Sequence, residues 1–287
     1  MKVLNDLACA QCSCFLSLRH SASGELVTLL ASTRCCALTP ASFFVAWHGV
    51  LTLSFAGFPS PLSALKTELG ALESAWALPL EQPGSKWPKL TLACLREGRQ
   101  LTADQLRQLY EITARMKEQV RNDPWRMPVR ELSYVKFASR SCERLLIRTD
   151  VPLKDSIVGG RAAVAAAAAA VAAGRPNVSV ISQGLPVDIP AEESAKVNSV
   201  LVELRDDTVD AYLVHVNKPG GRVQHYQSAH SESSLVAFAC PSRPQQAALS
   251  RAPAFLEEFR QQVDQLLPDY YEWFPWSSLH CTIRSMA

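Results

Sequence analysis

SLHCTIR, residues 278–284, places a histidine and a threonine two positions apart in an apolar, strand-like run. A tripeptide of this form occurs often by chance, so it says little by itself. A second stretch, KLTL, begins at Lys89. Lys89 follows Pro61 by 28 positions, and His280 follows Pro253 by 27. The C-terminal motif therefore has a twin in which the threonine is kept and the histidine is replaced.

The residues around each motif repeat one order of predicted elements. Each copy begins with a short apolar strand, continues with an amphipathic helix that a proline opens, and ends with the motif strand. The copies are 50–58, a helix from Ser60-Pro61 and 89–95, and then 234–240, a helix from Pro253 and 278–284. We therefore expect a duplicated strand–helix–strand lobe.

Between the copies the sequence predicts another helix and several strands. Thr102 and Gln105 form a capping-box pattern that opens an amphipathic helix. The alanine-rich residues 161–175 favour a surface helix or spacer, because alanine forms helices but offers little surface to pack. Short apolar runs predict strands, with a hairpin turn at Pro219-Gly220-Gly221, over 129–137, 199–205, 211–217 and 221–226. The sum is an α+β fold with antiparallel sheets.

The two motifs and their units resemble the 2H phosphoesterase superfamily, which includes 2′-5′ RNA ligase-like proteins and cyclic nucleotide phosphodiesterases. The resemblance implies two pseudo-repeated lobes with antiparallel sheets around a central groove, each lobe contributing a His-x-Thr strand. His280 and Thr282 form the second motif. At the first motif Lys89 stands where a histidine is expected, and Thr91 is retained.

The resemblance covers roughly residues 50–95 and 230–287 and departs from the family at Lys89. It implies hydrolysis of a small phosphodiester or cyclic phosphate at a nucleotide or RNA end, with neither metal nor cofactor. The alternative is a catalytically impaired protein of the same fold that binds RNA, a nucleotide or a protein partner. A third reading is an unrelated α+β scaffold.

The chemistry explains why such a site needs these residue types. Opening a cyclic phosphate requires one group to take a proton from water and another to protonate the departing oxygen, and two imidazoles can divide that work. Threonine hydroxyls can donate hydrogen bonds to the phosphate oxygens as charge builds there. A lysine with its usual pKa near ~10.4 is a cation at neutral pH, so Lys89 acts as a base only if burial lowers its pKa.

Each motif residue also has a plain structural interpretation. His280 on an apolar strand is typical of a hydrogen-bonded core histidine, Lys89 of a strand that begins at the solvent edge, and threonines of strands in general. Three other histidines are candidates for the missing imidazole or for surface positions: His215, His225 and His230. The first two lie on the predicted hairpin.

Aromatic and basic residues near the motifs are candidates for substrate binding. Trp273 and Trp276 precede His280 and suit stacking on a base, or else a hydrophobic plug that closes the sheet. Arg284 follows the motif by two positions and suits phosphate. A local basic rim is the set Lys86, Arg96, Arg99 and Arg284, although only alternate residues of a strand share a face.

Composition bounds the remaining possibilities. A formal charge of +2 is too small for general nucleic-acid or membrane affinity, so we expect no recognition of DNA sequence and no membrane partner. Oligomeric state is left open. Nine unevenly spaced cysteines favour a reducing, intracellular compartment, cytoplasmic or organellar. Cys9-x-x-Cys12 lacks a matching second pair for a metal, and the chain contains no P-loop and no G-x-S-x-G elbow.

The N-terminal residues differ from the rest. Residues 1–45 are rich in cysteine, serine and alanine, which is typical of a targeting segment or a disordered tail. The apolar run 35–58 raises the possibility of a membrane span, but Pro40 and the alternation that follows favour a loop leading into a buried strand. We therefore divide the chain into an extension, 1–45, and a domain, 46–287, with an alanine-rich insertion near 155–197.

Overall fold

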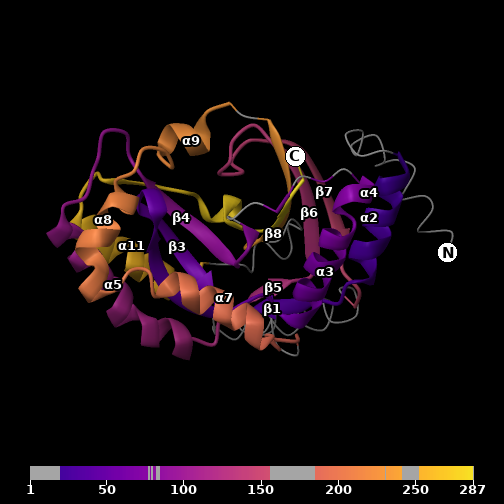
Figure 1. Cartoon of the computed structure of the whole chain (residues 1–287), viewed down its shortest axis with the longest axis horizontal. Helices are drawn as coiled ribbons and strands as arrows, with labels where there is room; N and C mark the ends of the chain where they lie inside the picture. Colours follow the sequence, from indigo (N-terminus) through magenta and orange to yellow (C-terminus); the bar gives the residue numbers. More distant parts are fainter. Residues whose placement is uncertain are drawn as a thin grey trace, which may run out of the picture.

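The computed structural model describes residues 20–76, 78, 80–81, 85–155, 185–229, 231–240 and 252–286. Its helices and antiparallel sheets confirm the α+β class (Figure 1). Three features of the sequence lie outside the described residues, namely the alanine-rich run 161–175, Cys9-x-x-Cys12 and His230.

Two four-stranded antiparallel sheets form the centre of the fold. The first has the order β2 (Pro40–Ala46), β3 (Val50–Phe55), β4 (Lys89–Leu95) and β9 (Tyr271–Trp273). The second has the order β10 (His280–Ser285), β8 (Glu232–Phe238), β6 (Glu131–Phe137) and β7 (Leu145–Pro152). A small third sheet pairs β1 (Cys36–Leu38) with β5 (Met127–Val129). The two large sheets meet where β4 contacts β10.

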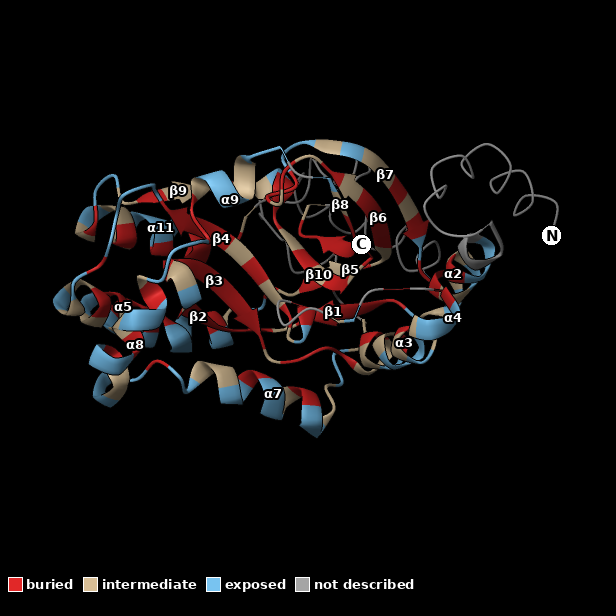
Figure 2. Ribbon diagram, turned by 45° about the horizontal axis from the view of Figure 1, so that its top comes forward, coloured by how far each residue is buried: buried red, intermediate tan, exposed pale blue. Residues whose placement is uncertain are grey.

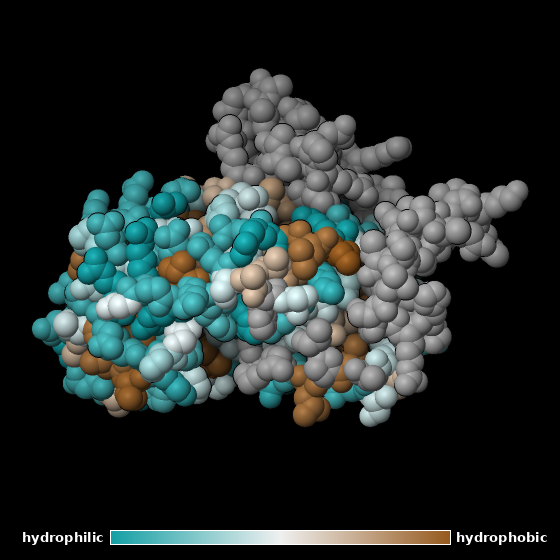
Figure 3. All heavy atoms as spheres, turned by 90° about the horizontal axis from the view of Figure 1, so that it is seen from above, coloured by the Kyte–Doolittle hydropathy of each residue, from teal (hydrophilic) through white to brown (hydrophobic). Residues whose placement is uncertain are grey.

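Helices cover the outer faces of these sheets. Figure 2 shows the strands mostly buried and the helices exposed on their outward sides, and Figure 3 shows a largely hydrophilic face with small apolar patches. The helices are α2 (His20–Ser32), α3 (Ser60–Ala71), α4 (Glu73–Trp76), α5 (Ala103–Asn122), α7 (Ala191–Leu201), α8 (Val209–Val216), α9 (Val223–Gln227) and α11 (Ala254–Leu266). Short 3₁₀ turns are η2 (Trp47–Gly49), η5 (Asp206–Thr208) and η6 (Trp276–Ser278). The predicted capping box of Thr102 and Gln105 opens α5.

The strand–helix–strand order occurs twice, with the same local geometry. In β3–α3–β4 the motif residue Thr91 pairs with Thr52, and the next pair is Ala93 with Leu51, so Leu92 is an extra residue. In β8–α11–β10 Thr282 pairs with Val236, and the next pair is Arg284 with Leu235, so Ile283 is the extra residue. A β-bulge therefore follows the threonine of each motif at the same place.

The helices of the two units lie on each other's sheets. Phe259 of α11 stacks on Phe43 of the first sheet, with ring centroids 3.8 Å apart and planes 7° apart. Helix α3, from the first unit, contacts β10 of the second sheet. Figure 1 shows this exchange, with α11 beside β3 and β4 and α3 below β6 and β8. Each sheet is thus completed by a helix from the other unit.

The predicted strands 199–205, 211–217 and 221–226 are wrong. These runs belong to the end of α7 and the turn after it, to α8, and to α9 with the residues before it. Helix α8 buries Val209, Tyr212 and Val216, a helical spacing that a short apolar run shares with a strand. The glycines of the predicted hairpin do form a turn, which joins two helices instead.

The expected boundary at residue 45 falls inside the fold. Residues 36–46 form β1 and β2 where the sequence favoured a loop, and Phe43 and Val45 are buried. The apolar run is explained by β2 and β3, an antiparallel pair joined through η2. Within the described residues no helix is long and apolar enough to cross a membrane.

Starting the protein at residue 46 removes α2, β1 and β2. We expect such a protein to lose cooperative unfolding, because Phe259 loses its stacking partner and β3 loses a neighbouring strand. A protein that starts at residue 20 keeps these elements and should unfold in one sharp transition. Thermal unfolding followed by circular dichroism measures both. A sharp transition for the shorter protein would show that β2 is dispensable.

Candidate functional site

Four of the predicted site residues lie together at the junction of the two sheets. Lys89 and Thr91 of β4 and His280 and Thr282 of β10 line one cavity of about 390 Å³. In both strands these positions alternate with buried residues, so the motif side chains share the open face. Two groups that are 191 positions apart in the sequence, Lys89 and His280, therefore line a common space.

His280 is held in one tautomer by its neighbours. Its Nδ1 lies 2.8 Å from the carbonyl oxygen of Ser278. Because a carbonyl only accepts, Nδ1 carries the hydrogen, and Nε2 of the neutral ring has a free electron pair. Burial lowers the pKa of His280 below its usual 6.5, although the bond to Ser278 opposes this. At pH 7 the ring is therefore neutral and can accept a proton.

Cys142 lies beside the nitrogen that carries this electron pair. Its Sγ is 3.7 Å from Nε2 of His280. Burial raises the pKa of the Cys142 thiol to about 12, so it remains protonated and serves as a weak donor to that nitrogen. The contact helps to orient the ring, and Nε2 can take a proton from another donor only when the thiol hydrogen points elsewhere.

Lys89 has an unusual pKa for a lysine. Burial lowers it to about 8, with a smaller contribution in the same direction from Lys66. The ammonium also lies over the ring of Trp87, 4.2 Å from its centroid. From the sequence, Lys89 can exchange a proton only if burial lowers its pKa, and Lys89 is buried in this way. Lys89 can therefore hold or release a proton near neutral pH.

The two threonines offer hydroxyl donors on either side of the cavity. Thr91 and Thr282 are half-buried, and within the described part of the chain neither hydroxyl has a hydrogen-bond partner. A phosphate in the cavity can therefore receive a hydrogen bond from each strand.

The other walls of the cavity contain polar side chains that do not belong to the two motifs. Arg140, in the loop after β6, forms an ion pair with Glu232 of β8 at 2.5 Å. His225 and Tyr226 of α9 also line the cavity. Burial raises the pKa of Tyr226, so its hydroxyl stays protonated. No local pattern marks Arg140, Tyr226 or Cys142, because each comes near the cavity or His280 only through tertiary packing.

Of the three histidines considered as substitutes, His225 reaches the cavity. It sits on α9, edge-on to Tyr226 with centroids 5.0 Å apart. His215 instead stacks on Trp47, with centroids 5.0 Å apart. The site thus holds a second imidazole as well as Lys89.

Arg284 does not line the cavity. The bulge at Ile283 reverses the alternation of β10, so Arg284 points to the opposite face of the strand. Its side chain is 2% exposed and forms an ion pair with Glu73 at 2.5 Å. The sequence argument for phosphate binding assumed regular alternation, and Arg284 holds α4 against the sheet instead.

Trp273 and Trp276 also lie away from the cavity. The indole nitrogen of Trp273 donates to Asp264 Oδ1 at 2.8 Å, and its ring meets Phe259 edge-on. Trp276 packs near Trp125, with centroids 6.3 Å apart. These contacts agree with the hydrophobic plug, the second of the two interpretations, in which the aromatic run closes the core beneath α11.

The predicted basic rim is only partly at the site. Arg96 pairs with Glu272 at 3.1 Å, and Arg99 lies over Tyr270, 4.9 Å from the ring centroid, beyond the far end of β4. Lys86 lines a larger chamber of about 830 Å³ next to the cavity. This chamber and the cavity have four residues in common: Lys89, Thr91, His225 and Tyr226.

The chamber extends from the Lys89 side of the cavity. Trp87 and Trp47 supply aromatic walls, and α7 supplies Lys196, Ser199 and Val200. Within the described residues no group of three or more His, Cys, Asp or Glu side chains is placed to hold a metal ion.

Comparisons of the chain with protein-family models, with curated proteins and with solved structures find no match. Function has to be inferred from the residues and their geometry.

Replacing Arg284 with methionine should destabilise the protein without altering the cavity. The change leaves Glu73 without its buried partner, and we expect the free energy of unfolding to fall by about 3 kcal/mol. Urea unfolding measures this loss, and Arg260→Met, at an arginine whose side chain is 51% exposed, is the control. If Arg284 instead binds substrate, phosphate affinity of the folded variant will fall while stability is unchanged.

Proposed function

We propose that this chain is a 2H-like phosphoesterase that hydrolyses a small phosphodiester, such as a 2′,3′-cyclic phosphate at a nucleotide or RNA end. One observation carries the proposal: Lys89 with Thr91, and His280 with Thr282, line one cavity from strands that share the same register and the same bulge. A phosphate between the strands can meet an acid–base group and a hydroxyl from each side.

The pKa shifts assign the two roles. His280, whose pKa lies below 6.5, is neutral at pH 7 and takes a proton from water through Nε2. The water oxygen then bonds to phosphorus, and the bond from phosphorus to one ribose oxygen breaks. Lys89, with a pKa of about 8, is mostly protonated at pH 7 and donates a proton to that oxygen. The products are a phosphate monoester and a free hydroxyl.

The hydroxyl groups stabilise the charge that develops during this step. Thr91 and Thr282 can donate hydrogen bonds to the non-bridging oxygens as the phosphorus becomes five-coordinate. Exchange of protons with solvent afterwards returns His280 to its neutral form and Lys89 to its ammonium form. A lysine thus does the work of the imidazole that the resemblance leads one to expect.

The pH dependence of kcat/KM should be bell-shaped with limbs that report these groups. Activity should rise through a pKa below 6.5, as His280 loses its proton, and fall through about pH 8, as Lys89 loses its own. Lys89→Arg keeps the charge but holds its proton tightly. It should lower the rate by about 100-fold or more and remove the falling limb near pH 8. An unchanged falling limb would exclude Lys89 as the acid.

His280→Ala should lower hydrolysis of a 2′,3′-cyclic nucleotide by ~10²–10⁴-fold, because the base is lost. Lys89→His, which restores the family's motif, should keep or raise the rate. His215→Gln changes an imidazole outside the cavity and serves as the control. Steady-state kinetics with purified protein measures all three. Phosphate binding without turnover in the unmodified protein would instead favour the catalytically impaired alternative, in which Lys89 only holds an anion.

A further inference from the structure

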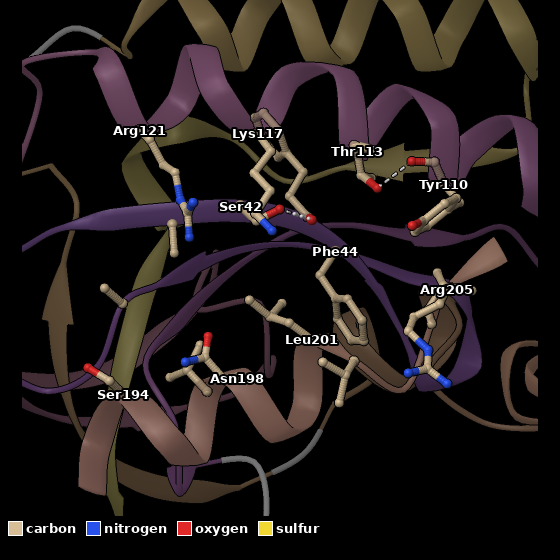
Figure 4. Close-up of a pocket in the computed structure, with 17 residues that line it drawn as sticks. Ser42, Phe44, Tyr110, Thr113, Lys117, Arg121, Ser194, Asn198, Leu201 and Arg205 are labelled. Carbon is tan, nitrogen blue, oxygen red and sulfur yellow. Dashed lines mark hydrogen bonds between the residues drawn. The ribbon is translucent and has the colours of Figure 1, made fainter. Parts of the chain in front are cut away.

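A second cavity lies away from the motif residues. It has a volume of about 460 Å³ and lies between α5 and α7, above β2 (Figure 4). Its lining and that of the chamber beside the motifs have one residue in common, Phe44. Helix α7 stands between the two spaces, with Asn198 and Leu201 facing the second cavity and Lys196 and Val200 facing the chamber.

Three basic residues line this cavity. Of the 17 described residues that line it, Lys117, Arg121 and Arg205 are basic and none is acidic. Figure 4 shows Lys117 and Arg121 extending from α5 toward α7. Neither has an acidic partner in the part of the chain that the structure describes. Arg205 approaches from the other side, paired with Asp207 at 3.1 Å.

Lys117 and Arg121 are exposed and lie close enough on α5 to repel each other weakly. They are four positions apart on one helix, where like charges repel. Arg115 of the same helix, by contrast, bonds to Gln262 of α11 at 2.8 Å. An anion between Lys117 and Arg121 would relieve the repulsion and accept hydrogen bonds from both.

The interior of the cavity is apolar. Phe44, Val197 and Leu201 form its walls, with Phe44 and Val197 buried. Thr113 is also buried, but its hydroxyl already donates to the carbonyl oxygen of Tyr110 at 2.8 Å. The apolar walls suit a small apolar group, and the basic residues suit an anionic one. This combination is typical of small-molecule sites of this volume.

We propose that this cavity binds a small organic monoanion with a short apolar body. The apolar body lies between Phe44 and Leu201, and the anionic group meets Lys117 and Arg121. Of its own residues, helix α7 buries only Glu193 and Val197. A ligand that fills the gap beside it adds packing and holds the helix in place.

Octanoate titrated into the full-length protein by calorimetry tests the site, with octan-1-ol and inorganic phosphate as the apolar and anionic halves of the probe. Octanoate should bind at least tenfold more tightly than either. The double variant Lys117→Gln, Arg121→Gln should weaken octanoate binding at least tenfold and leave octanol binding unchanged. Arg115→Gln, on the other side of α5, is the matched control and should bind as the unmodified protein does.

Two further measurements locate the ligand. Hydrogen exchange over residues 191–201 should slow when octanoate is bound. Lys89→Gln should leave octanoate affinity unchanged, which separates this cavity from the motif site whether or not that site is catalytic. Equal binding of octanol, no loss in the double variant, equal loss in Arg115→Gln, or loss in Lys89→Gln would each overturn the proposal.

Discussion

The contact between β4 and β10 sets the geometry on which the candidate site depends. Each strand carries its motif immediately before a bulge. The bulge of β10 is held by hydrogen bonds from a lysine of α3. The ammonium of Lys66, on α3, donates to the carbonyl oxygens of Ile283 at 2.7 Å and Ser85 at 2.9 Å. Because Ile283 is the extra residue, the lysine binds the strand where the ladder is interrupted, and the motif residues keep their direction into the cavity.

Burial at this junction has two effects that act together. The same exclusion of water that builds the cavity lowers the pKa of both Lys89 and His280. In each case the charged form becomes more costly, so Lys89 moves toward exchanging its proton near neutral pH and His280 is held in its neutral form. A lysine at a solvent-exposed strand end would remain a permanent cation. The local sequence specifies only the residue type, and the surrounding fold determines its chemistry.

The repeated spacing from proline to motif was sufficient to predict both strand–helix–strand units. It also led to the prediction that Lys89 and His280 face a common groove. Strand alternation alone did not predict which way Arg284 points. A bulge has no reliable local signature, and it turns every following side chain to the opposite face of the strand. Alternation also failed to distinguish strand from helix at residues 211–217, because a short apolar run fits the period of a strand and that of a helix equally well. Arg140 and Tyr226 reach the cavity, and Cys142 reaches His280, through contacts between distant segments, which no local pattern records.

The exchange of helices between the units has a consequence for how the chain acquires its structure. The first sheet is complete only when β9 pairs with β4 and α11 covers Phe43. Both elements are synthesised more than 150 positions after β4. During translation α5 can pack on β2 early, but the part of this face around Phe43 that α11 covers waits for the distal part of the chain. Such long loop closures slow folding and leave apolar surface exposed in the meantime.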